Sequence, residues 1–183
     1  MIMISLLETE KNQQHLHAHN LLRECLKAYG KEYKGEAELS VGEHGKPYLT
    51  AHPEIHFNLS HSSGIAVCLT AEHPCGVDCE KVRNYRENVV KRAFSAEEQA
   101  QIEAAAPSER DLLFFRLWTL KEAYVKAIGI GISYPLNEVS FRLDGNSIEC
   151  SITGCRFRQY ILRGGVYVVS SCILDENKKG GQL

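Results

Sequence analysis

Apolar residues in the first third of the chain fall mostly in short runs, interrupted by one segment with helical spacing. The run at 1–7 predicts a first strand, and apolar positions three and four apart predict a helix from Asn12 to about Gly30. Two later runs, at 65–71 and 76–82, predict strands separated by a His73-Pro74 turn. This third of the chain therefore mixes one helix with several strands.

The middle third is helical, and the last third returns to strands. Helical spacing and Ser-x-x-Glu or Ser-x-x-Asp starts predict helices at 85–94, 95–106 and 108–128. Strand-like apolar segments joined by an Asp-Gly turn and a Gly-Gly turn predict strands at 139–143, 147–153, 156–162 and 166–173. Because a helix followed by strands occurs twice, we predict an α+β fold with two similar halves, at 1–84 and 85–175. The tail at 176–183 is expected to be frayed.

Charge and cysteine content narrow the functional class. The 183 residues carry 21 Lys and Arg against 23 Asp and Glu, a net charge of -2, which argues against nucleic acid or an anionic membrane as a partner. No window has the length of apolar sequence that a membrane span needs. Seven cysteines without a basic leader predict a cytoplasmic protein with reduced thiols.

Two carboxylates on one predicted strand form a candidate metal site. Asp78 and Glu80 flank Cys79, and strand side chains alternate in direction, so both carboxylates face the same side. Like charges this close favour a cation between them, and hard oxygen ligands suit Mg²⁺. A strand whose polar face meets water explains the same pattern.

The helix predicted at 108–128 carries charges on a side that is also apolar. One stripe holds Leu113, Leu117, Leu120, Tyr124 and Ala127. Trp118, Glu122 and Lys126 lie opposite this stripe, beside further apolar residues. A helix apolar on two sides packs between layers, so Glu122 and Lys126 are expected in a partly enclosed interface. The alternative is an ordinary exposed pair one turn apart.

Three further polar groups have both a functional and a structural interpretation. We interpret Asn58–Gly64 as a turn whose hydroxyls, imidazole and backbone N–H groups suit phosphate oxygens, although many turns have this composition. Lys46 precedes Pro47 on a stiff stretch, but lone lysines are usually solvated. His15 and His19 could share a metal ion, although an exposed polar helix face is the favoured explanation.

Five segments, taken together, resemble the 4'-phosphopantetheinyl transferase superfamily of the surfactin-synthetase type. They are Gly45-Lys-Pro47, Phe57-Asn-Leu-Ser-His-Ser62, Gly76-Val-Asp-Cys-Glu-Lys81, Phe94-Ser-Ala-Glu-Glu98 and Trp118-Thr-Leu-Lys-Glu-Ala-Tyr-Val-Lys126. The resemblance implies two halves related by a pseudo-two-fold axis, with the site between them. It also implies a monomeric enzyme that uses Mg²⁺ to move the phosphopantetheine arm of coenzyme A to a serine of an apo acyl- or peptidyl-carrier protein.

The resemblance also implies roles for individual residues. The Mg²⁺ ligands would be Asp78, Glu80 and Glu122. Lys126 would contact the phosphate under attack, and Glu122 is the best placed general base. The nucleotide would be held by Lys46, Pro47, Ser60, His61 and Ser62. Glu98 matches a family glutamate, but it also completes a capping box begun by Ser95, and we favour capping.

Two features of the sequence leave alternatives open. Upstream of Gly45, Gln14, His15 and His17 stand where longer members carry basic residues for the 3'-phosphate of coenzyme A, which puts its recognition in question. A non-catalytic module that binds a nucleotide or a carrier protein, or a phosphoanhydride hydrolase, would therefore also fit. The residues expected to dock an acidic carrier are Arg83, Arg86, Lys91 and Arg92, unless they form a solvated helix face.

Overall fold

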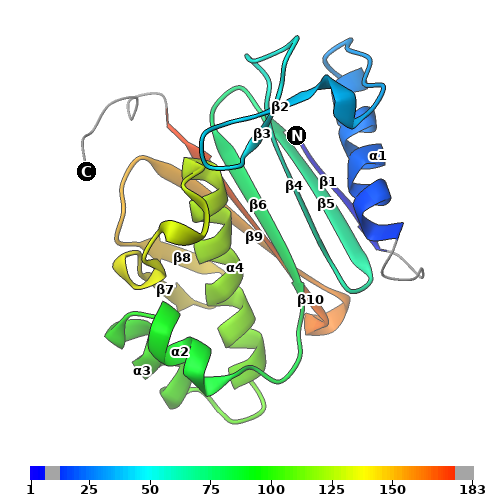
Figure 1. Ribbon diagram of the computed structural model, residues 1–183. Helices are drawn as coiled ribbons and strands as arrows, with labels where there is room; N and C mark the ends of the chain where they lie inside the picture. The colour runs from blue at the N-terminus through cyan, green and yellow to red at the C-terminus, as the bar shows by residue number, and fades with distance from the viewer. Residues whose placement is uncertain (7–12, 176–183) are drawn as a thin grey trace.

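The computed structural model describes residues 1–6 and 13–175, which form two units of the same topology (Figure 1). The first unit consists of β1 (Ile2–Leu6), α1 (Gln14–Lys27), β4 (His56–Ser62) and β5 (Ile65–Ala71). The second consists of β6 (Cys75–Lys81), α4 (Arg110–Ile128), β9 (Cys155–Leu162) and β10 (Tyr167–Leu174). In each, the last strand lies between the other two and is antiparallel to both, giving the orders β1-β5-β4 and β6-β10-β9. The predicted α+β fold with two similar halves is confirmed.

The remaining elements decorate these two units. Between α1 and β4 lie η2 (Glu36–Glu38), β2 (Leu39–Val41) and β3 (Pro47–Leu49). Between β6 and β9 lie α2 (Glu87–Ala93), α3 (Ala96–Ala104), η3 (Gly131–Ser133), η4 (Leu136–Glu138), β7 (Phe141–Asp144) and β8 (Ser147–Cys150), and η5 (Arg163–Gly165) joins β9 to β10. The three predicted middle helices are thus present. The tail at 176–183 lies outside the described residues.

The two sheets pack face to face between the two long helices. Figure 1 shows α1 and α4 on opposite sides of the strands. Alternate residues of β5, β6 and β10, including Val67, Val77 and Val169, form the apolar core between the sheets. Since side chains alternate along a strand, the other face of β6 carries Gly76, Asp78 and Glu80 toward α4.

The hydrogen bonding divides the chain at 72–74, between β5 and β6. β6 pairs with β10 over its whole length, with Asp78 opposite Ser170, so it belongs to the second sheet. The boundary between residues 84 and 85 stays a prediction. It was placed after β6 because local patterning identifies a strand but does not identify the strand with which it pairs.

The segment interpreted as the turn Asn58–Gly64 is a strand for most of its length. β4 extends to Ser62, and only Ser63 and Gly64 turn into β5. Its polar side chains alternate with Phe57 and Leu59, which pack against α1 and the first sheet. The turn prediction was wrong because polar residues on one face of a half-buried strand have the same composition as a loop.

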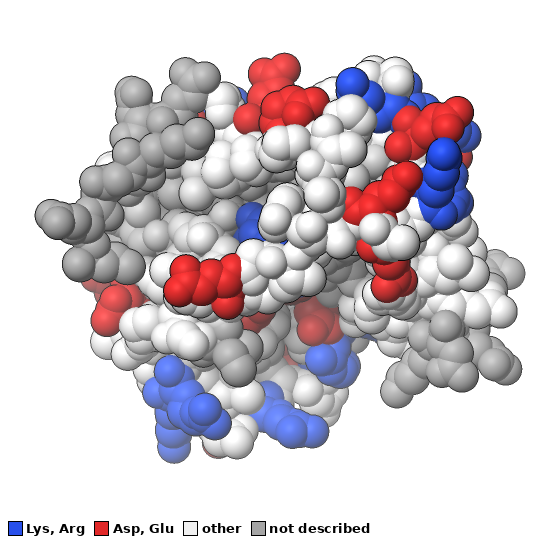
Figure 2. Space-filling model, turned by 45° about the horizontal axis from the view of Figure 1, so that its top comes forward, with Lys and Arg blue, Asp and Glu red and all other residues white. Residues whose placement is uncertain are grey.

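Figure 2 shows both acidic and basic side chains on the face that it presents, with several basic ones along its lower edge. Within the described residues, no helix combines the length and the apolar character that crossing a membrane requires. None of the seven cysteines forms a disulfide, and Cys75 and Cys79 are buried between the sheets.

Gly76 lets β6 approach the backbone of α4 closely. A Cβ atom at this position would lie 2.1 Å from the carbonyl oxygen of Ala123 and 2.4 Å from the amide nitrogen of Ala127. Both are backbone atoms of a buried helix, so the helix itself would have to move. The close approach brings the acidic face of β6 beside α4.

Gly76→Ala is therefore expected to lower the free energy of unfolding by about 1–3 kcal/mol, the usual cost of overpacking a core. The urea midpoint measures this change. Gly42→Ala is the matched control, because its Cβ would meet nothing closer than 3.4 Å. Equal midpoints for the two variants would contradict the close contact.

Candidate active site

The edge strands β4 and β6 are joined through side chains of β4. Three backbone N–H groups of β6 donate to these side chains: Val77 N to Asn58 Oδ1 at 2.8 Å, Cys79 N to Ser60 Oγ at 3.3 Å and Lys81 N to Ser62 Oγ at 3.5 Å. The exposed edge of β6 is thereby satisfied without a backbone ladder. This arrangement places the serine hydroxyls of β4 beside the carboxylates of β6.

Asp78 is the most buried acid of this region, with 7% of its surface exposed. Its Oδ1 accepts from Lys126 Nζ at 2.6 Å and from Ser60 Oγ at 3.0 Å. Its Oδ2 is buried and has no hydrogen-bond partner among the described residues. Burial raises the pKa of Asp78, and Lys126 offsets part of this shift.

Glu80 lies on the same side of β6, closer to solvent. Its Oε2 accepts from Ser62 Oγ at 3.0 Å and from Arg83 Nη1 at 2.7 Å. The guanidinium of Arg83 also lies over the ring of Phe115, 4.8 Å from its centre. Glu80 therefore bridges the acidic face of β6 and the surface that follows it in the chain.

Glu122 and Lys126 face these acids from α4, one helical turn apart. Burial raises the pKa of the Glu122 carboxyl, and the negative charges of Asp78 and Glu80 raise it further. Burial would lower the pKa of Lys126, but the charges of Asp78 and Glu122 outweigh it and the pKa rises. The enclosed interface predicted from the two-sided helix brings together the four residues Asp78, Glu80, Glu122 and Lys126.

The acid cluster, defined as Asp78, Glu80 and Glu122, has the donor chemistry of a Mg²⁺ site. Three carboxylates supply hard oxygen atoms, and the unpartnered Oδ2 of Asp78 has a free lone pair in a buried position. The carboxylate oxygens are not all within 4.8 Å of one another in this structure, in which Lys126 binds Asp78 and Arg83 binds Glu80. The residues present therefore fit the cation by donor type and by the orphaned oxygen.

Lys46 links the start of β6 to the end of α4 by hydrogen bonds. Its Nζ donates to the carbonyl oxygens of Cys75 at 2.8 Å and Ala127 at 2.9 Å. Burial lowers its pKa, and the helix C-terminus offers a favourable place for a cation. Its contact with a nucleotide stays a prediction. Its hydrogen bonds to the two carbonyl oxygens were not predicted from the sequence.

A cavity of about 360 Å³ is lined in part by Pro47, His61 and His15. Burial lowers the pKa of His61, and the neighbouring charges of His15 and Lys126 lower it further. Ser60 and Ser62 instead donate to Asp78 and Glu80. The nucleotide contacts predicted for Pro47, His61 and the two serines remain untested.

A buried ion pair behind α4 was not predicted. Lys121 Nζ lies 2.7 Å from Glu98 Oε2, both side chains are fully buried, and Lys121 also donates to the carbonyls of Leu136 and Val139. Glu98 completes the capping box with Ser95 and accepts from Phe141 N, so the capping interpretation is confirmed. The signal available in the sequence for this buried ion pair was the position of Lys121 among apolar residues spaced three and four apart.

Comparisons with known proteins agree on one family. Residues 74–169 match the family model of the 4'-phosphopantetheinyl transferase superfamily. A 4'-phosphopantetheinyl transferase of Bacillus subtilis is 41% identical over 67% of this chain and 56% of its own length. The 4'-phosphopantetheinyl transferase Sfp of Bacillus subtilis (strain 168) is 35% identical over 76% of this chain and 64% of its own length.

The chain thus spans 56% and 64% of the length of these two curated relatives. Among solved structures, a holo-(acyl-carrier-protein) synthase from Bacillus anthracis in complex with CoA (3',5'-ADP) is similar with a TM-score of 0.47. It is 18% identical, and the match covers 55% of this chain and 94% of that chain.

Proposed function

Because this chain belongs to the 4'-phosphopantetheinyl transferase superfamily, we propose that it transfers the 4'-phosphopantetheine group of coenzyme A to a carrier-protein serine. The acceptor is an apo acyl- or peptidyl-carrier protein, and the second product is adenosine 3',5'-bisphosphate. The observation that carries the proposal is the convergence of three carboxylates and Lys126 at the β6–α4 interface, with Asp78 Oδ2 buried and unpartnered.

In this proposal Asp78, Glu80 and Glu122 hold Mg²⁺, which when bound neutralises negative charge on the pyrophosphate of the coenzyme. The serines of β4 orient two of these acids by donating a hydrogen bond to each. Ser60 and Lys126 hold Oδ1 of Asp78, which leaves Oδ2 directed away from the hydrogen-bonded pair. The carboxylates are thus preorganised before the substrate arrives.

The carrier hydroxyl oxygen attacks the phosphorus that bears pantetheine, and the bond from that phosphorus to the leaving bisphosphate breaks. Glu122, which faces Asp78 and Glu80 from α4, accepts the hydroxyl proton as the general base. Lys126 stays protonated, because its pKa is raised, and places its positive charge on the phosphate oxygens. Coenzyme A itself occupies the cavity at Pro47 and His61.

The carrier protein docks at a second cavity, of about 320 Å³, which is lined by Glu80, Arg83, Arg86, Val89 and Trp118. It combines apolar walls with exposed arginines, and Lys91 and Arg92 of α2 are exposed nearby in the chain. An acidic carrier helix complements such a rim, and Glu80 connects the rim to the reacting centre.

The test is the mass of apo carrier proteins after incubation with this protein, coenzyme A and Mg²⁺. We expect at least one carrier of fatty acid, polyketide or peptide synthesis to gain a single phosphopantetheine, only when coenzyme and Mg²⁺ are both present. Tight coenzyme binding without any gain in mass would indicate a binding module instead. Cleavage of free coenzyme without a carrier would indicate a hydrolase.

A further inference from the structure

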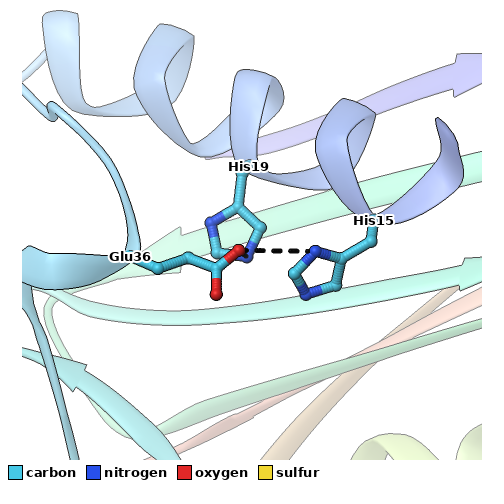
Figure 3. A group of neighbouring side chains, drawn as sticks. All are labelled: His15, His19 and Glu36. Carbon is cyan, nitrogen blue, oxygen red and sulfur yellow. Dashed lines mark ion pairs between the residues drawn. The ribbon is translucent and has the colours of Figure 1, made fainter.

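Two histidines and a glutamate meet on the wall of the cavity beside α1 (Figure 3). His15 Nδ1 lies 3.5 Å from Glu36 Oε1, and His19 Nε2 lies 3.6 Å from the same oxygen. One ligand atom from each of the three residues lies within 4.8 Å of the others. Among the described residues, no other group of three His, Cys, Asp or Glu side chains has its ligand atoms this close to one another.

The local fold brings these side chains together from two elements. His15 and His19 are one turn apart on α1, so both rings lie on the same helix face, with centres 4.6 Å apart. Glu36 begins the short helix η2, directly after Gly35, whose φ of 145° lets the chain turn there. Figure 3 shows the Glu36 carboxylate directed at both rings.

His19 is held in place by a buried partner. Its Nδ1 shares a hydrogen bond of 2.7 Å with Tyr33 Oη, and only 9% of His19 and 3% of Tyr33 are exposed. The prediction that the histidines lie on an exposed helix face is therefore wrong for His19. Because Tyr33 occupies Nδ1, the other ring nitrogen, Nε2, is the one that faces Glu36, as in metal ligands fixed by an outer partner.

The separations agree with tetrahedral coordination by a small divalent ion. Ligand atoms about 2.0–2.1 Å from a tetrahedral Zn²⁺ lie about 3.3 Å from one another. The two nitrogen-to-oxygen distances of 3.5 and 3.6 Å are near this value. Two neutral imidazoles and one carboxylate also form the His₂Glu set that zinc sites use with one open position.

We propose that His15, His19 and Glu36 form a binding site for Zn²⁺, separate from the acid cluster. Imidazole nitrogen favours Zn²⁺ over Mg²⁺, whereas the three carboxylates of the acid cluster favour Mg²⁺. The three residues lie on the wall of the cavity that Pro47 and His61 also line. A zinc ion bound here would lie against any molecule that occupies that cavity.

The test is calorimetric titration of the folded protein with Zn²⁺ in excess Mg²⁺, which competes with Zn²⁺ for the carboxylates of the acid cluster. We expect one saturable site, and at least about 100-fold weaker binding for His15→Ala and for Glu36→Gln, because loss of outer-shell groups alone costs 10- to 100-fold. Tyr33→Phe should weaken binding by about 10-fold. Substituted Co²⁺ should give the visible absorption of a tetrahedral site in the wild-type protein, and His15→Ala and Glu36→Gln should lose this absorption.

His17→Ala is the matched control, because His17 lies on the same helix outside the group. Glu54→Gln is the second control, since Glu54 pairs with His52 at 3.4 Å and belongs to no group of three neighbouring ligand residues among those described. Both controls should bind Zn²⁺ as the wild-type protein does. Absence of saturable Zn²⁺ binding, or equal affinity in the His15 variant, the Glu36 variant and the controls, would overturn the proposal.

Discussion

Glu122→Gln is expected to abolish phosphopantetheine transfer while leaving the thermal midpoint of unfolding equal or higher. In the proposed mechanism the substitution removes a metal ligand and the group that accepts the hydroxyl proton, and loss of a general base alone lowers kcat by about 10²- to 10⁴-fold. It also removes a carboxylate that burial and the charges of Asp78 and Glu80 disfavour. Transfer is measured by carrier mass, and stability by thermal unfolding in the absence of Mg²⁺.

The direction in which stability changes with pH separates the effect of the substitution on stability from its effect on transfer. The folded pKa of Glu122 lies above its ordinary value of 4.5, so its contribution to stability is complete below that value and is lost as the pH rises through the folded pKa. Glu122→Gln should remove this loss at neutral pH. Glu97→Gln, at an exposed position of α3, is the control and should change neither activity nor midpoint. A folded Glu122→Gln protein with full activity would make Glu122 structural.

The residues of the acid cluster were predictable because each is encoded by a local pattern. The Asp-x-Glu spacing places Asp78 and Glu80 on one face of any strand, and two apolar sides of a helix enclose Glu122. Neither inference needs the partner strand or helix. That these acids from two distant segments share one site was implied by the family resemblance and not by the local patterns.

The partners of the predicted side chains were not predictable in the same way. Ser60 and Ser62 have the composition of a phosphate-binding turn, but their hydroxyls bind carboxylates on a neighbouring strand. Lys46 is buried against two carbonyls, and His19 against Tyr33, by contacts distant in sequence. Such pairings depend on strand order and helix packing, which local periodicity does not specify.

The ion pair of Lys121 and Glu98 connects α4 to the elements that cover it. Burial disfavours both charges, raising the pKa of Glu98 and lowering that of Lys121, and their mutual attraction opposes both shifts. Each partner also has backbone contacts: Glu98 with Ser95 and Phe141, and Lys121 with two carbonyls of the segment after η3. Removing one partner therefore leaves the other buried with an uncompensated charge.

Lys121→Met is accordingly expected to lower the free energy of unfolding by about 3–5 kcal/mol, the cost of breaking a buried pair. The double variant Lys121→Met with Glu98→Gln should recover part of this loss, because the introduced glutamine side chain can keep the capping contact without a buried charge. Urea unfolding of the four proteins of this cycle measures the coupling. The deficit of Lys121→Met should shrink as the pH falls toward the ordinary glutamate pKa, where Glu98 becomes protonated. Strictly additive single losses would show that the two charges stabilise α4 independently.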